Sequence, residues 1–176
     1  SLSSYSGIDL TDFFSYYVFD TITHHFAIES LTFSENSAKV KIFSTTENNY
    51  NQPCSNTRIP ITFMDSAFNR YKTMIIDNGT REEHNFSLPF TPIAAFLDFD
   101  EEFFDLTTDS YKFISEPGNY EFKNSYFKAN VTSCQDTILI RPTLHWIGAD
   151  NTQSIEGINR FSQKHYWTIE GINLEN

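Results

Sequence analysis

The sequence predicts a mainly β protein, with a short N-terminal helix followed by two immunoglobulin/fibronectin-like β-sandwich units, the second small or incomplete. Three observations lead to this fold class. Short segments that alternate apolar and polar residues recur along the chain. Turn-forming residues separate these segments at the spacing typical of antiparallel sandwiches. Helical periodicity is confined to the N-terminal segment.

Length and composition exclude several classes of function. The 176 residues allow one ordinary domain or two small ones, and 18 Phe with 9 Tyr supply ample core material. The formal net charge of −11 has the wrong sign for binding phosphate backbones, which argues against nucleic acid as a partner. No apolar run approaches the length of a membrane span. Residues 1–8 lack the features of a signal peptide, so we interpret the chain as an excised fragment.

A helix is expected from Asp9 to about Asp20. Asp9 is a good N-cap residue, and Asp12 places an acid in the first turn, where it complements the helix dipole. The apolar residues that share one broad helical face are Leu10, Phe13, Phe14, Tyr17 and Val18. The β-branched residues from Thr21 to Thr23 favour extended backbone, so the helix should end before them.

About six strands are expected in the first unit, which we place at residues 1–108. They cover residues 25–33, 38–43, 58–64, 70–77, 81–88 and 93–99. The polar turn after the first strand predicts a hairpin with the second, and Asn78-Gly79 is the strongest short hairpin signal in the chain. Pro60 cannot donate a ladder hydrogen bond, so its strand should lie at a sheet edge or carry a bulge.

The second unit, residues 109–176, is expected to be a small β-rich module. Its predicted strands cover residues 120–122, 125–134, 137–147 and 165–172. So few residues bury little apolar surface. This unit must therefore pack on the first unit, or it is truncated and exposes a sheet edge.

Motifs for metal binding and nucleophilic catalysis do not occur in the sequence. None of the five histidines forms H-E-x-x-H, H-x-H or a helical i, i+4 pair. Adjacent His24 and His25 should point to opposite faces of a strand, which prevents them from binding one ion together. The chain also has no G-x-S-x-G elbow and no glycine-rich phosphate loop. We therefore predict no catalytic residue, no metal ligand and no cofactor in this chain.

Two further features have alternative interpretations. Cys54 and Cys134 could form a disulfide in an oxidising compartment, although two separate buried thiols are favoured. The segment from Asp98 to Asp105 carries five carboxylates in eight residues and could offer oxygens to calcium. The apolar residues interleaved with these acids are expected to point inward, which leaves the acids facing water: Phe96, Leu97, Phe99, Phe103 and Phe104.

Aromatic residues are the remaining candidates for a binding surface. The second unit contains Tyr111, Tyr120, Tyr126, Trp146, Tyr166 and Trp167. Such rings could line a sugar-binding platform or a protein interface. They could also fill the small core, which is the more frequent role of aromatic residues in a sandwich.

Two segments resemble the region that follows the catalytic domain in secreted bacterial relatives of aminopeptidase N, the gluzincin zinc metallopeptidases. The first covers residues 7–106 and includes GIDLTDFF, AKVKIF, RIPITFMDSAFNRYKTMIID and IAAFLDFDEEFFDL. The second comprises TLHWIGAD at residues 143–150 and SQKHYWTIEG at residues 162–171. Since H-E-x-x-H and its distal glutamate ligand are absent from the sequence, no catalytic or zinc-binding residue can be transferred to this chain.

The resemblance implies a noncatalytic C-terminal part of a larger, extracellular or periplasmic metallopeptidase-like protein. We expect its helix to dock through Phe13, Phe14 and Tyr17 against the catalytic region of the parent protein. The alternative is a freestanding carbohydrate- or protein-binding module that uses Trp146, Tyr166 and Trp167.

Overall fold

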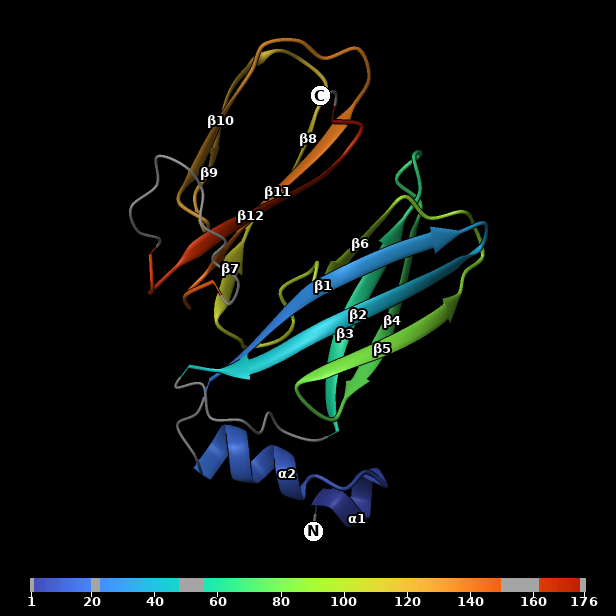
Figure 1. Ribbon diagram of the computed structural model, residues 1–176, viewed down its shortest axis with the longest axis vertical. Helices are drawn as coiled ribbons and strands as arrows, with labels where there is room; N and C mark the ends of the chain where they lie inside the picture. Colours follow the sequence, from blue (N-terminus) through green and yellow to red (C-terminus); the bar gives the residue numbers. More distant parts are fainter. Residues whose placement is uncertain (1, 20–22, 48–55, 150–161, 175–176) are drawn as a thin grey trace. The chain divides into compact units, whose positions relative to one another are not determined.

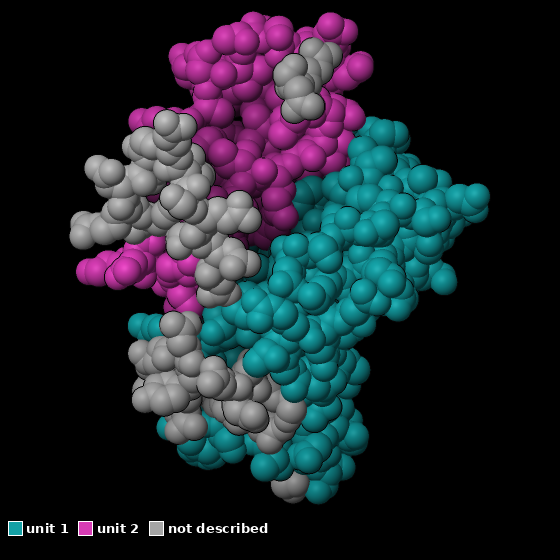
Figure 2. Space-filling model, in the orientation of Figure 1, with its two compact units in different colours: residues 1–105 teal, residues 106–176 magenta. Residues whose placement is uncertain are grey.

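Antiparallel β-strands make up most of the protein, in agreement with the predicted mainly β class (Figure 1). The computed structural model describes residues 2–19, 23–47, 56–149 and 162–174. The chain divides into two compact units, residues 1–105 and residues 106–176 (Figure 2). The boundary expected from the sequence lay three residues further along, after residue 108. No helix in the described ranges is both long and apolar enough to cross a membrane.

The N-terminal segment is helical, as predicted, but it is divided differently. It consists of α1 (Leu2–Ser6), α2 (Thr11–Phe13) and η1 (Phe14–Phe19), a π-helical stretch. Leu10, and not the predicted Asp9, occupies the N-cap position of α2 and makes no side-chain cap bond. The Asp9 carboxylate accepts a hydrogen bond from the Thr11 backbone N–H at 3.0 Å. The helix thus begins one residue later than the predicted N-cap would place it, and α1 was not predicted.

Unit 1 contains six strands arranged as two three-stranded antiparallel sheets. The strands are β1 (His24–Ser34), β2 (Ser37–Thr46), β3 (Thr57–Met64), β4 (Arg70–Asp77), β5 (Arg81–Ser87) and β6 (Ala94–Leu97). One sheet has the order β1-β2-β5 and the other the order β4-β3-β6. The predicted hairpin forms between β1 and β2, with Ser34 paired to Ser37 across the turn.

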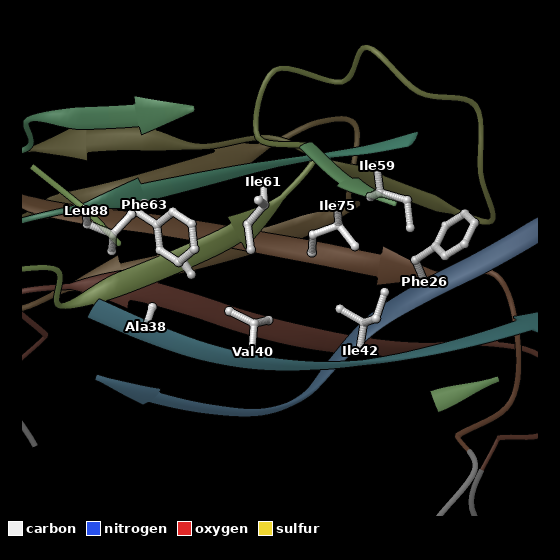
Figure 3. Packing of buried hydrophobic residues seen from close by; sticks show 10 residues of the cluster. Phe26, Ala38, Val40, Ile42, Ile59, Ile61, Phe63, Ile75 and Leu88 are labelled. Carbon is white, nitrogen blue, oxygen red and sulfur yellow. The ribbon is translucent and has the colours of Figure 1, made fainter. Parts of the chain in front are cut away.

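The two sheets of unit 1 enclose one hydrophobic core. Alternate residues of β2 point toward alternate residues of β3, because successive side chains of a strand face opposite sides (Figure 3). The buried residues of this core are Phe26, Ala38, Val40, Ile42, Ile59, Ile61, Phe63, Ile75, Leu88 and Ala95. The alternating pattern in the sequence therefore identified the correct inward face of both central strands.

The hairpin expected at Asn78-Gly79 does not form, because β4 and β5 belong to different sheets. β4 pairs with β3, and β5 pairs with β2. The polar groups of Asn78 make hydrogen bonds outside a hairpin turn. Its side-chain oxygen accepts the Asn56 backbone N–H at 3.2 Å, and its own N–H donates to Glu82 at 3.2 Å. The Asn-Gly pair thus forms a crossover between the two sheets.

Pro60 lies in a central strand, although the sequence predicted an edge strand or a bulge. β3 lies between β4 and β6 and shows no bulge in its pairing with β4. However, β6 pairs only with residues 61–64 of β3. The Pro60 carbonyl accepts the Asp98 N–H at 2.8 Å, so its nitrogen faces the point at which β6 has already ended. No neighbouring strand there requires the donor that proline lacks.

Unit 2 contains a two-stranded and a four-stranded antiparallel sheet. The hairpin consists of β9 (Gly118–Phe122) and β10 (Phe127–Val131). In the larger sheet, β11 (Ile138–His145) pairs on one side with β12 (Tyr166–Ile172) and on the other with β7 (Thr107–Asp109) and β8 (Lys112–Ile114). The strands β9 to β12 were predicted, whereas β7 and β8 were not.

One hydrophobic cluster of unit 2 joins the β9–β10 hairpin to the larger sheet. Ile114, Phe122 and Ile140 are the buried residues of this cluster. Tyr120, Phe127, Ala129, Val131 and Ile138 pack around these residues and are only partly buried. The hairpin β9–β10 therefore packs on the sheet face that carries Ile140. Leu139, Leu144 and Ile172 of the larger sheet are also buried.

Candidate functional site

The strand register of unit 2 brings both tryptophans of the chain to one sheet face. Leu144 of β11 lies directly opposite Trp167 of β12. Trp146 is two residues beyond Leu144, so it lies on the same face. Trp146 is 45% exposed and Trp167 is 43% exposed. This pair was predicted as a candidate interaction site.

The loop of the β9–β10 hairpin contacts both tryptophans. The Trp167 Nε1–H donates to the Ser125 carbonyl oxygen at 2.8 Å. The neighbouring Tyr126 packs edge-on against Trp146, with ring centroids 6.3 Å apart. On the strand side, the Trp146 Nε1–H donates to the Thr108 hydroxyl at 3.1 Å, and His165 packs edge-on against Trp167 at 5.3 Å.

These contacts define an aromatic platform, which we take as Tyr126, Trp146, His165 and Trp167. Each indole is fixed at its N–H edge by a protein acceptor, while much of its surface remains in contact with solvent. Half-exposed aromatic rings of this kind suit ligands that stack on a ring face. The sequence placed Trp146, Trp167 and Tyr126 among the aromatic candidates, but the contribution of His165 depends on strand pairing.

Tyr166 lies on the opposite face of the sheet from the platform. It pairs directly with His145, and the two rings stack nearly parallel with centroids 4.2 Å apart. His145 is buried, and its Nε2 lies 2.9 Å from the Thr168 hydroxyl. The three aromatic residues grouped in the sequence prediction are therefore divided between two faces.

The apolar helical face is a second candidate surface. Phe13 is 49% exposed and Phe14 is half-buried, with their rings in edge-to-face contact at 5.5 Å. Phe19, which packs on Phe14 at 6.3 Å, is 77% exposed. The side chain of Tyr17, the third residue predicted for this face, lies outside the described set.

No group of three or more His, Cys, Asp or Glu side chains suited to a metal ion occurs in the part of the chain that the structure describes. His24 and His25 are both buried in unit 1. Burial lowers the pKa of His25 to about 4 and also lowers the pKa of His24. These histidines therefore have the environment of neutral core residues.

Of the two cysteines, Cys134 lies in the described part of the chain. Cys134 is a half-buried free cysteine whose Sγ lies 2.7 Å from the Asp136 carbonyl oxygen. It lies beside a cavity of about 440 Å³ next to the end of β10. Cys54, its potential disulfide partner in the sequence prediction, lies outside the described residues.

The acidic segment after β6 is partly structural. The Asp98 carboxylate accepts backbone N–H groups of Glu102 and Phe103 at 2.8 and 2.9 Å and so closes the turn. Lys72 of β4 pairs with Asp100 at 3.1 Å and with Glu102 at 2.6 Å. Phe104 was expected to point inward, but it is 77% exposed because the chain has left the strand by that position.

A buried ionic group in unit 2 was not predicted. Arg141 on β11 donates to Asp109 on β7 and, at 3.2 Å, to Glu170 on β12. Arg141 and Asp109 are 4% and 3% exposed. Burial raises the pKa of Glu170, although the Arg141 charge opposes this shift. Only the strand register, with Arg141 opposite Glu170, brings these distant residues together.

Comparisons with family models, with curated proteins and with solved structures find no match to this chain.

Proposed function

We propose that this chain is the noncatalytic C-terminal β region of a larger aminopeptidase N-like zinc metallopeptidase, with a structural or interaction role. The observation that carries this proposal is the exposure of apolar side chains along the helical segment. Phe13 is 49%, Val18 55% and Phe19 77% exposed. Exposed apolar residues gathered on one segment are typical of a surface that another part of a protein covers.

The sequence resemblance suggests which part covers this surface. In the metallopeptidases that residues 7–106 resemble, the corresponding helix closes the helical domain and leads into a series of strands. By analogy, the apolar residues of α2 and η1 would pack on the region that precedes Ser1. The β units would then hold downstream parts of the protein at a fixed angle, in an extracellular or periplasmic setting.

We also propose that unit 1 is an immunoglobulin/fibronectin-like sandwich. Its two sheets, β1-β2-β5 and β4-β3-β6, enclose a common core. This order is that of strands A-B-E and C′-C-F in such domains. Among the described strands of unit 1, none corresponds to the last strand of that fold. Unit 2, with a two-stranded and a four-stranded sheet among its described residues, would be a second, incomplete module.

The complete product of the gene tests the proposed class. We expect its sequence to contain H-E-x-x-H upstream of Ser1 and the protein to bind zinc through that motif. Metal analysis of the purified protein and of its His→Ala variant at the motif measures this. A complete gene product without such a motif would contradict the proposal.

Matched substitutions test the docking role of the helical segment. Phe19→Ser in the complete protein should lower its melting temperature, because the side chain is buried only when the segment is docked. Phe104→Ser is the control, since Phe104 has the same exposed fraction of 77% in unit 1. We expect a loss of about 2 kcal/mol for Phe19→Ser and little change for Phe104→Ser. Equal effects of the two substitutions would count against docking.

A further inference from the structure

Hydrogen bonds within the protein hold the two half-exposed indoles of the aromatic platform in place. The two indole N–H groups are used within the protein, by the Thr108 hydroxyl and the Ser125 carbonyl oxygen. These bonds hold the polar edge of each indole in place. The parts of the rings that stay exposed are therefore available for stacking and not for donating a hydrogen bond.

Tyr126 extends the platform from the hairpin loop. It is 74% exposed, and its backbone adopts a left-handed conformation with φ of 52°. Non-glycine residues adopt this conformation uncommonly, and it costs free energy unless the surroundings require it. The Tyr126 N–H donates to the Lys123 carbonyl at 3.2 Å, which closes the turn that places the ring beside Trp146.

We propose that this platform binds carbohydrate, with the C–H faces of pyranose rings stacked on Trp146 and Trp167. Stacking on a fixed aromatic face requires area and rigidity, and the platform supplies both. A proline-rich peptide is the main competing ligand for such a surface. Recognition of its carbonyl groups would use indole N–H donors, and both of these already have acceptors in this protein. The geometry therefore favours a sugar over a peptide.

This inference is independent of the proposed metallopeptidase class. The platform belongs to unit 2, whereas the apolar helical face belongs to unit 1. Loss of carbohydrate binding would leave the docking proposal unchanged, and a complete gene product without a zinc motif would leave the platform unchanged. Each proposal can therefore be contradicted without affecting the other.

Tryptophan fluorescence gives a selective assay, because the chain contains only two tryptophans and both lie in the platform. The 176-residue chain would be titrated with cellohexaose, chitohexaose and xylohexaose, and with decaproline as the peptide probe. We expect at least one oligosaccharide to change the emission saturably, and decaproline to cause no change. No response to any of the three oligosaccharides, or a saturable response to decaproline alone, would overturn the proposal.

Variants measured by calorimetry connect the binding to the platform. Trp146→Ala and Tyr126→Ala should each weaken binding of the responding oligosaccharide by about tenfold. Phe113→Ala is the matched control, since Phe113 lies on β8 of the same sheet and is 41% exposed. Tyr126 is on the hairpin loop and mostly exposed, so its substitution should preserve folding, which urea unfolding would verify. Unchanged affinity in the folded Tyr126→Ala and Trp146→Ala variants would contradict the assignment.

Discussion

At the scale of single residues, the most consequential arrangement is the buried ionic group around Arg141. Its guanidinium forms ion pairs with Asp109 and Glu170, which lie on the two neighbouring strands. A buried ion pair contributes little net stability when both partners are present, but removing one partner leaves a charge without compensation. The charged forms of the Asp109 and Glu170 carboxylates are therefore stabilised by the Arg141 guanidinium.

Arg141→Met tests this dependence. The substitution retains most of the side-chain volume but leaves the Asp109 carboxylate buried beside Glu170. We expect a loss of about 3 kcal/mol in the free energy of unfolding at neutral pH, measured by urea denaturation. The matched control is Arg58→Met on the exposed side of β3, which should change stability by less than about 0.5 kcal/mol. Losses of similar size would show that the ionic group has no special role.

Asp77 provides a residue-scale prediction for pH dependence. Its side chain is fully buried and accepts a hydrogen bond from the Ser44 hydroxyl at 2.7 Å. Burial raises the pKa of Asp77 above 3.8, while Ser44, the Gly79 N–H and nearby His84 oppose the rise and nearby Glu82 adds to it. The folded state thus holds the proton more tightly than the unfolded state does. The stability that this group contributes is fully present below pH 3.8 and is lost as pH rises through the raised pKa.

Asp77→Asn removes this dependence. We expect the variant to gain about 1 kcal/mol relative to the natural protein at neutral pH, because it buries no ionisable group at this position. The difference in unfolding free energy between the two proteins should move steadily against the variant as pH falls toward 3.8. Chemical denaturation across this pH range measures it. A difference that stays constant with pH would show that the pKa of Asp77 is not raised.

At the level of strands, Pro142 explains where one strand pairing is interrupted. Pro142 lies in β11, opposite the break between β7 and β8. The Trp146 N–H donates to the Leu106 carbonyl at 2.8 Å, so even-numbered residues of β11 direct their backbone groups toward this side. At residue 142 the donor is missing. β7 and β8 therefore form one edge strand that is interrupted at Ser110 and Tyr111.

Pro142→Val should restore the missing ladder bond. The new N–H at residue 142 would donate to the Ser110 carbonyl and should exchange slowly with deuterium. Pro60→Val is the matched control, because the nitrogen of residue 60 faces the point at which β6 has ended. Its new amide should exchange much faster. Equal exchange rates at the two positions, measured by NMR, would contradict this explanation of the break.

Strand positions could be predicted from the sequence because side-chain alternation is a local property. β2 shows this clearly, since the buried Val40 and Ile42 alternate with the exposed Lys39 and the half-buried Lys41. Pairing between strands was less predictable, because it depends on which edges the whole unit must satisfy. The Asn78-Gly79 turn has the local sequence of a hairpin, yet its flanking strands pair with β3 and β2.

In the candidate site, too, local features were predictable from the sequence, whereas contacts that depend on strand pairing were not. The sequence predicted Trp146 and Trp167 as candidates for a binding surface, with a role in the core as the more frequent alternative, and the register places them on one face. Tyr166 was grouped with them, but adjacent residues of a strand point to opposite faces, so it stacks on His145 instead. The contacts with Thr108 and Ser125 connect segments far apart in the chain, which no local pattern predicts.

Across the two units, the candidate surfaces are separate. Unit 1 carries the exposed apolar helical segment, and unit 2 carries the aromatic platform. Both proposed roles concern surfaces, consistent with a protein that supports or binds other molecules. We propose that the helical segment docks on a preceding region of a longer protein.

Hydrogen exchange measured by mass spectrometry on the complete gene product, alongside residues 1–176 alone, tests this claim most directly. The amides of residues 11–19 are the ones to compare, because α2 and η1 carry the exposed Phe13, Val18 and Phe19. Docking predicts strong protection of these amides in the complete product and rapid exchange in the shorter chain. Equally rapid exchange in both proteins, or a gene that encodes no further region before Ser1, would contradict the account.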